Sequence, residues 1–288
     1  MKTFWNMNNK AKFEPLEENL EADVCIIGGG ITGISTGYYL SKEGKKVVIL
    51  EKDTICSHTS SGSTAKVTSQ HGLIYKYLYD SKGKEFAKKY FEENIKCNFE
   101  RKSAFVYTET EKEVEKIKDE VEVAKKLGID AEYTNKIDIN IDILGAIEFK
   151  NQAQFDISKY VNGLSDKILI NGGKIFENSK AIDLEEKNKK YIISTDKGSI
   201  TAKDVVIATR YPVITFPGYY FLKMYQSTSY AIVFDTKTDI NTNGFFINSE
   251  IPQISFRSID NERKNLLLVV GYDYKTGDEI NGNPFEYL

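Results

Sequence analysis

Hydrophobic and polar positions near the start of the chain predict a strand, a helix and a second strand in direct succession. Val24 to Ile27 is an apolar run that is too short for a helix and is followed by glycines, which is typical of a strand buried on both faces of a parallel sheet. From Ile31 the apolar residues recur at helical spacing until Gly44, and Val47 to Leu50 is the next buried strand. This order predicts a βαβ unit.

The remaining pattern predicts two further kinds of segment. Residues 52–72 are crowded with Ser, Thr and Gly, show no period, and are expected to form a loop. Helical spacing covers residues 73–100, 109–127 and 157–170, with Asp156 as the N-cap of the last helix. Short strands are expected at 104–108, 146–149 continuing through 152–155, 174–176, 180–185, 191–195, 199–201, 204–209 (buried on both faces), 230–234, 244–248, 253–257 and 266–270. The order favours an α/β nucleotide-binding domain that an α+β domain interrupts and follows.

Three glycines between the first strand and the first helix fit the pattern G-x-G-x-x-G. Gly28 allows a tight turn, Gly30 lets the backbone approach a pyrophosphate, and Gly33 lets helix and strand pack closely. The helix N-terminus would face the phosphates, and Glu51, about 20 residues further on, is placed to accept the ribose hydroxyls. The alternative is a βαβ unit that binds no nucleotide.

Composition and charge exclude several classes of protein. The 288 residues carry a formal net charge of −3, which gives no electrostatic reason to expect nucleic acid. Residues 1–9 are polar and lack the apolar stretch of a signal peptide, and no run reaches the ~20 apolar residues of a membrane helix. Three widely spaced cysteines form neither a disulfide framework nor a metal cluster, so a cytoplasmic protein without a metal is expected.

The loop over 52–72 leaves the second strand beside the glycine turn, where ligands bind in open α/β sheets. Hydroxyl groups on Ser60, Ser61, Ser63 and Thr64 could donate to phosphates or to a polar ring edge. A solvated connection is the alternative interpretation.

Longer motifs carry a resemblance to a known family. Residues 24–33 and 47–52 match an FAD fingerprint, and residues 198–209 match a second element of the same family. The chain thus resembles the FAD-dependent amine and amino-acid oxidoreductases of the D-amino-acid oxidase and glycine oxidase superfamily. Residues 63–75, 152–155 and 208–212 make it most similar to bacterial members that append a C-terminal Rieske domain.

The resemblance implies an FAD-binding Rossmann-like domain of the glutathione-reductase-2 type. An interleaved α+β substrate domain would lie on a mixed, mainly antiparallel sheet. The implied FAD-binding domain is discontinuous, over residues 1–100 and 151–215, and the substrate domain covers 101–150 and 216–288. The superfamily's final FAD-contacting segment has no counterpart after Leu288, and no Rieske pattern is present. A truncated product, self-association or a partner chain is therefore expected at that end, with weak FAD binding and little turnover.

The resemblance also implies non-covalent FAD, because Ala65 and Lys66 stand where some relatives carry a flavin-linking His. Arg210 replaces the Gly that usually ends the second element. The implied FAD-binding residues are Gly28, Gly30, Ile31, Thr32, Gly33, Glu51, Lys52, Ser60, Ser61, Ser63, Thr64, Ala181, Ala208 and Thr209.

The implied reaction oxidises a C–N bond of an amine or amino acid by hydride transfer to the flavin. His71 is a candidate base, Lys66 a cation near the flavin and Arg257 a clamp for a substrate carboxylate. Each also has an ordinary structural interpretation, as do Tyr225 and Tyr230 as cavity-lining residues. A non-catalytic FAD-binding subunit and an NAD-dependent dehydrogenase remain as alternatives.

Overall fold

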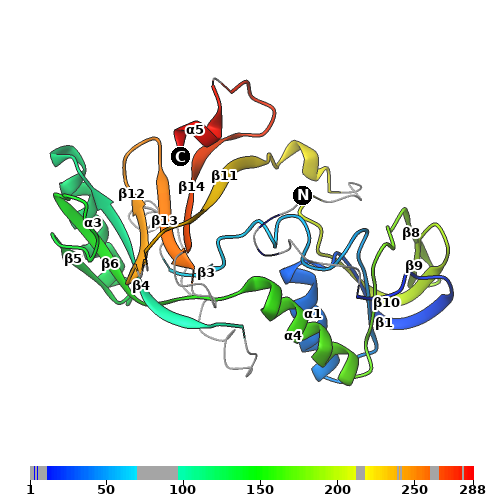
Figure 1. Cartoon of the computed structure of the whole chain (residues 1–288). Coiled ribbons are helices and arrows are strands. Elements are labelled where there is room, and N and C mark those ends of the chain that lie inside the picture. Colours follow the sequence, from blue (N-terminus) through cyan, green and yellow to red (C-terminus); the bar gives the residue numbers. More distant parts are fainter. Residues whose placement is uncertain are drawn as a thin grey trace. The chain divides into compact units, whose positions relative to one another are not determined.

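The computed structural model describes residues 3, 5, 12–69, 97–211, 218–238, 240, 242–259, 266–280 and 282–288. His71 and most of the helix expected over 73–100 lie outside these residues. The chain divides into two compact units (Figure 1). The first unit comprises Met1–Ser63, Asn94–Cys97 and Asp156–Met224, and the second unit comprises Thr64–Glu93, Asn98–Phe155 and Tyr225–Leu288.

The first unit contains a six-stranded sheet in the order β7-β2-β1-β10-β9-β8. The first four strands pair in parallel, and β9 and β8 continue the sheet antiparallel. The elements of this unit are β1 (Asn19–Ile27), α1 (Ile31–Lys42), β2 (Val47–Leu50), α4 (Ile157–Ile170), β7 (Lys174–Phe176), β8 (Asp183–Lys187), β9 (Lys190–Ser194), β10 (Ser199–Ile207) and the 3₁₀ turn η2 (Tyr220–Leu222).

Both faces of the β1–β2 pair are buried, as the short apolar runs predicted. On one face, a Cβ placed on Gly37 of α1 would lie 2.7 Å from Ile49 and 3.4 Å from Ile168 of α4, so α1 and α4 pack closely on the strands. Cys25 and Leu50 belong to a separate apolar cluster. Because successive side chains of a strand point to opposite faces, this cluster covers the other face.

The strand predictions for β8 and β10 differ from the structure. The segments expected at 199–201 and 204–209 form one continuous strand, β10, and the strand expected at 180–185 begins only at Asp183. The second half of β10 is also not fully buried, since Ile207 is 38% exposed. The reason is that β9 pairs only with residues up to Ala202, so the described sheet covers the end of β10 on its β1 side alone.

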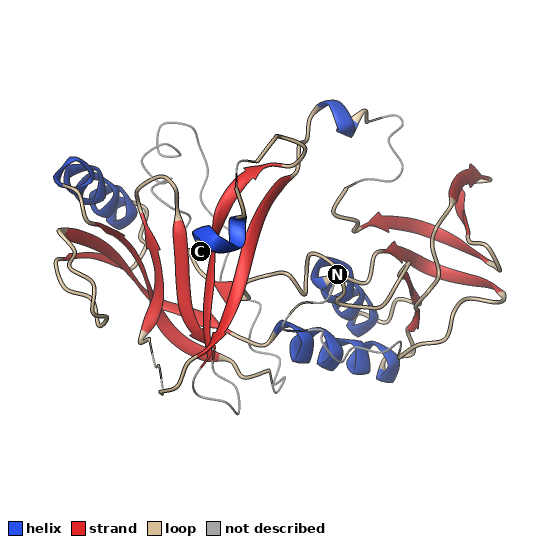
Figure 2. Ribbon diagram, turned by 45° about the horizontal axis from the view of Figure 1, so that its top comes forward, coloured by secondary structure: helices blue, strands red, loops and turns tan. Residues whose placement is uncertain are grey.

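The second unit contains an eight-stranded sheet (Figure 2). Seven of its strands follow the order β11-β14-β13-β12-β4-β6-β3, and β5 pairs with β6. The sheet is mixed but mainly antiparallel, because only the β12–β4 pair is parallel among the described strands. Its elements are β3 (Lys66–Val67), β4 (Glu100–Thr108), α3 (Glu111–Lys126), β5 (Ala131–Thr134), β6 (Gly145–Gln154), β11 (Ser227–Asp235), β12 (Gly244–Asn248), β13 (Ile254–Ile259), β14 (Leu266–Lys275) and α5 (Pro284–Tyr287).

Helix α3 covers one face of this sheet through the apolar stripe that its spacing predicted. Ile117, Val121 and Ala124 are buried against a cluster that includes Phe149 and Phe245. Most of the remaining positions of α3 are charged, so the packing of this apolar stripe holds the helix on the sheet.

The unit boundary falls inside the segment that was expected to be a plain loop. Lys66 and Val67 pair with Gln154 and Ala153 of β6, and this pairing carries the chain from Thr64 onward into the second unit. The sequence placed residues 1–100 and 151–215 in the FAD-binding domain, whereas contacts group the described residues 64–69, 98–100 and 151–155 with the second sheet.

No helix in the described part of the chain is long and apolar enough to cross a membrane.

The cap of α4 offers a direct test of the local structure. The Asp156 side chain accepts a hydrogen bond from the Lys159 N–H at 3.0 Å, whereas Thr110, the N-cap of α3, forms no side-chain cap bond. Asp156→Ala should therefore lower the free energy of unfolding by about 1 kcal/mol. Thr110→Ala, the matched control, should lower it by less in the same urea titration. Equal losses in the two variants would contradict the assigned caps.

Candidate functional site

The glycine turn between β1 and α1 is the tightest part of the first unit. Gly28 has a φ of +116°, a conformation that side chains other than hydrogen rarely permit, and its N–H donates to the Leu50 carbonyl at 2.8 Å. A Cβ on Gly33 would lie only 1.9 Å from the Gly28 carbonyl oxygen. The first and third glycines are therefore required by the close contact between the turn and the helix, as the motif predicted.

The N-terminus of α1 presents backbone donors next to this turn. Gly30 is the N-cap and has no side chain to accept from the first helical N–H groups, which have no carbonyl partner within the helix. The Ile31 N–H donates to Ser60 Oγ at 2.9 Å. The N–H groups of Thr32 and Gly33, at the positive end of the helix dipole, are by position the donors for an anion.

Glu51 holds the turn from the end of β2. Its side chain is 8% exposed, Oε2 accepts the Gly29 N–H at 2.7 Å, and Oε1 accepts the Asp53 N–H at 3.0 Å. Carboxylate oxygens can accept more than one hydrogen bond each, so these contacts leave acceptor capacity for a ligand. The ribose role of Glu51 stays a prediction.

The carboxyl end of β10 closes the other side of the turn. The Ala208 N–H donates to the Ile27 carbonyl at 2.9 Å, and a Cβ on Gly28 would lie 2.6 Å from the Ala208 carbonyl oxygen. Thr209 follows, and its buried Oγ1 has no hydrogen-bond partner among the described residues. A buried hydroxyl without a partner is costly, and a bound polar group would satisfy it.

The structure brings only part of the predicted FAD set to this turn. Ser61 Oγ donates to the His58 carbonyl at 2.9 Å, and Lys52 Nζ lies 3.6 Å from the Asp53 carboxylate. Ala181 packs against the apolar cluster of the sheet, and Thr64 belongs to the second unit. The residues that meet at the turn itself are Gly28, Gly30, Ile31, Thr32, Gly33, Glu51, Ser60, Ala208 and Thr209.

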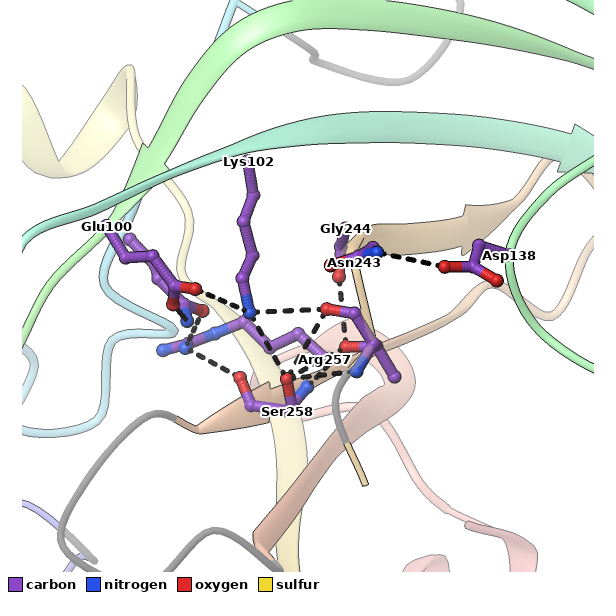
Figure 3. A network of polar contacts seen from close by, with 9 residues as sticks. Glu100, Lys102, Asp138, Asn243, Gly244, Arg257 and Ser258 are labelled. Carbon is purple, nitrogen blue, oxygen red and sulfur yellow. Dashed lines mark hydrogen bonds and ion pairs between the residues drawn. The ribbon is translucent and has the colours of Figure 1, made fainter. Parts of the chain in front are cut away.

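The second unit contains a buried polar network around Arg257 (Figure 3). Arg257 is 1% exposed, and its Nη1 donates to Gln154 Oε1 while its Nη2 donates to the Thr64 carbonyl. Gln154 Nε2 in turn donates to Glu100 Oε2 at 2.6 Å. Both terminal nitrogens of the predicted carboxylate clamp thus already donate to protein oxygens.

Lys102 belongs to the same network and was not singled out by its sequence position. Its Nζ lies 3.2 Å from Glu100 Oε1, 3.2 Å from the Thr242 carbonyl and 3.4 Å from Ser258 Oγ. Figure 3 shows Lys102 and Glu100 extending toward Arg257 and Ser258. Only the pairing of β4 with distant strands creates this arrangement, so no local pattern could have revealed it.

Lys66 lies next to this network on β3, directly opposite Gln154. Its Nζ is 5.9 Å from the centre of the Phe245 ring. Burial, together with the charge of Arg257, lowers the pKa of Lys66 from 10.5 to about 7. Burial also lowers the pKa of Arg257 to about 10, against the opposing effect of the Glu100 carboxylate.

Similarity to known proteins agrees with the geometry of the turn. YhfW of Bacillus subtilis, which bears the name of a Rieske 2Fe-2S iron–sulfur protein, is 31% identical over 96% of this chain and 57% of its own length. The gamma-glutamylputrescine oxidoreductase of Escherichia coli is 24% identical over 70% of this chain and 52% of its own length. The chain therefore spans little more than half the length of these curated relatives.

Two solved structures share the fold. L-proline dehydrogenase from P. horikoshii superposes with a TM-score of 0.72 and 18% identity over 94% of this chain and 75% of its own. Glycine oxidase from Bacillus cereus superposes with a TM-score of 0.71 and 17% identity over 93% of this chain and 76% of its own.

The sequence also matches a family model over nearly its whole length. The model is described as FAD dependent oxidoreductase, and it covers residues 23–285. That range includes the glycine turn, the end of β10 and the polar network of the second unit. The chain belongs to the FAD-dependent oxidoreductase family.

Proposed function

We propose that this chain forms the FAD-binding part and a substrate-binding part of an oxidoreductase that acts on the C–N bond of an amine or amino acid. The observation that carries the cofactor assignment is the glycine turn, which places backbone donors and the Thr209 hydroxyl around one site. The substrate class is supported by the relatives, since three of them are named for glycine, proline and gamma-glutamylputrescine.

The residues of the first unit fit FAD. A pyrophosphate would lie at the N–H groups of Thr32 and Gly33, where Gly30 leaves the backbone accessible. Glu51 would accept ribose hydroxyls with its remaining acceptor capacity, and Thr209 Oγ1 would gain its missing partner. When bound, FAD supplies the hydride acceptor, and the protein binds, orients and shields it.

Lys66 is the side chain of the second unit that a substrate carboxylate would meet with least rearrangement. Arg257 and Lys102 already donate to protein oxygens, whereas Lys66 lies over the Phe245 ring. Burial and the charge of Arg257 lower the pKa of Lys66, and the negative charge of a bound carboxylate would oppose both effects. Binding an anionic substrate would accordingly be coupled to proton uptake by Lys66.

Three other functions are distinguished by the same experiments. A non-catalytic FAD-binding subunit would retain a flavin spectrum but show no reduction by amines. Oxidation of a C–O bond is favoured by one structural neighbour, an FAD-containing L-alpha-glycerophosphate oxidase from Mycoplasma pneumoniae with a TM-score of 0.68. An NAD-dependent dehydrogenase would bind no flavin.

Anaerobic reduction tests the proposed reaction. The purified, FAD-loaded protein should lose its visible flavin absorbance when mixed with at least one member of a panel of amines and amino acids. Glycerol phosphate and other alcohols serve as the comparison panel and should leave the spectrum unchanged. Bleaching by the alcohols alone would replace C–N with C–O oxidation, and no bleaching by either panel would support the non-catalytic subunit.

Substitution of two glycines separates cofactor binding from folding. A Cβ on Gly30 would meet only Ser60 Oγ, at 2.9 Å, so Gly30→Val should fold but bind no flavin. A Cβ on Gly33 would meet backbone at 1.9 Å, so Gly33→Ala should lower the melting temperature of the apoprotein itself. Thermal melting and flavin absorbance measure the two effects. A yellow Gly30→Val protein would remove the turn from the cofactor site.

The charge on Lys66 should make stability depend on pH. Below about pH 7 the Lys66 amine is charged in both the folded and the unfolded state, so the folded protein bears the full cost of the buried charge. Above about pH 10.5 the amine is neutral in both states, and this cost vanishes. Lys66→Met should thus stabilise the protein most below pH 7, with a gain that shrinks toward pH 10.5.

Lys150→Met is the control for this titration, because a hydrogen bond from the exposed Lys150 to Glu132 raises the pKa of Lys150. That variant should gain no stability at any pH. A Lys66→Met protein whose melting temperature follows that of the unmodified chain at every pH would refute the buried charge.

A further inference from the structure

Glu177 is a fully buried carboxylate that receives three backbone N–H groups. It follows β7 in the first unit and is 0% exposed. Oε2 accepts from the N–H groups of Lys12 and Phe13, the latter at 2.9 Å, and Oε1 accepts the Ile55 N–H at 2.6 Å. Hydrogen bonds to an ionised acceptor are among the stronger ones in proteins, so Glu177 ties two distant segments to the end of β7.

One of these segments packs directly on the glycine turn. The Cys56 N–H donates to the Gly29 carbonyl at 3.0 Å, and a Cβ on Gly29 would lie 3.0 Å from Ile55 Cγ2. The N–H that Glu177 accepts therefore belongs to a residue in contact with the turn. Five residues beyond Ile55, Ser60 accepts the Ile31 N–H at the start of α1.

The backbone around Glu177 is itself fixed to the end of β2. The Glu51 N–H donates to the Phe176 carbonyl at 2.9 Å, the Ser179 N–H donates to the Glu51 carbonyl at 2.8 Å, and the Asn178 N–H donates to the Asp53 carbonyl at 2.8 Å. Glu177 is thus anchored to the strand pair that carries Glu51.

The second segment held by Glu177 begins at Lys12, and Trp5, earlier in the chain, contacts the far end of the same loop. The indole N–H of Trp5 donates to the Ser63 carbonyl at 3.0 Å, and Ser158 Oγ donates to the Trp5 carbonyl at 2.7 Å. The Leu16 N–H donates to Ser179 Oγ at 2.8 Å. The loop over residues 52–63 is therefore held at Ile55 by Glu177 and at Ser63 by the N-terminal segment.

We infer that Glu177 is a positioning residue for the FAD site, acting through the loop 52–63 rather than by contact with the cofactor. By fixing Ile55 against the glycine turn and the N-terminal segment against Ser63, it keeps Ser60 at the start of α1 and limits the escape of bound FAD. The inference rests on FAD binding and is independent of which bond the enzyme oxidises.

Glu177→Gln tests this role with little change in volume. The amide NH₂ must face at least one of the three N–H groups, so at least one anchor is lost. The expected result is release of FAD that is faster by about ten-fold to a hundred-fold, the effect of losing one hydrogen bond to a charged group. Release is measured by trapping free FAD after dilution of the loaded protein.

The single tryptophan, Trp5, supplies a second readout that needs no cofactor. In the apoprotein, Glu177→Gln should shift Trp5 emission to longer wavelength as the N-terminal segment loosens from the loop. Asp166→Asn is the matched control, because Asp166 forms an exposed ion pair with Lys12 of the same segment. That control should leave both FAD release and Trp5 emission unchanged.

A lower melting temperature with unchanged FAD release and unchanged emission would assign Glu177 a purely structural role and overturn the inference. If Glu177→Gln does not fold, Trp5→Phe decides, since it removes the indole donor to Ser63 and keeps an aromatic ring in its place. Faster FAD release from Trp5→Phe would support the anchored loop, and unchanged release would overturn it. An unmodified chain that binds no FAD would instead refute the cofactor assignment on which the inference rests.

Discussion

The close approach of α1 to the glycine turn is the constraint on which the first unit depends. Gly33 lies so near the Gly28 carbonyl that no side chain fits between them, and this contact fixes the direction in which α1 leaves β1. The helix N-terminus consequently points toward the carboxyl ends of β1 and β10, where open α/β sheets bind their ligands. Glu51 holds Gly29 from one side and Ala208 closes the other, so the turn is rigid before any cofactor arrives.

Two side chains outside the glycine motif, the carboxylate of Glu177 and the hydroxyl of Ser60, contribute to this preorganisation of the turn. Glu177 and Ser60 hold the loop that borders the turn, and they act on segments far apart in the sequence. A rigid donor set loses less conformational freedom on binding, which favours affinity. The second unit differs in its charge balance. Lys102 and Arg257 are buried around one carboxylate, Glu100, so positive charge is in excess near Lys66.

Local sequence signals located the elements whose ends are marked by caps and glycines. Helix α4 begins after Asp156 and ends before Gly172, as expected, because the carboxylate cap and the glycines define both ends. The strand β10 was split into two because its middle carries Lys203 and Asp204, which are exposed at the uncovered part of the sheet. A strand of two residues such as Lys66–Val67 has no detectable period, and only its pairing with β6 creates it.

The residues of the candidate site also divide into those that local sequence indicated and those that it did not. The structural roles of Gly28 and Gly33 were predicted because they follow from backbone geometry within a short stretch of chain, whereas the contact of Glu51 with the Gly29 N–H was not predicted. Ala181 was predicted as a cofactor residue by resemblance and packs against the apolar cluster of the sheet, while Thr64 joins the second unit. Glu177 was missed, since nothing next to it in sequence indicates that it accepts N–H groups from Lys12, Phe13 and Ile55.

A comparison of FAD with FMN tests whether the turn binds the pyrophosphate and adenosine part of the cofactor. FMN carries the same ring and one phosphate but lacks the adenosine and the second phosphate. In equilibrium titrations of the apoprotein, we expect a dissociation constant for FAD at least about ten-fold lower than that for FMN, the effect of one or more charge-assisted hydrogen bonds. Equal affinity for the two flavins would contradict it.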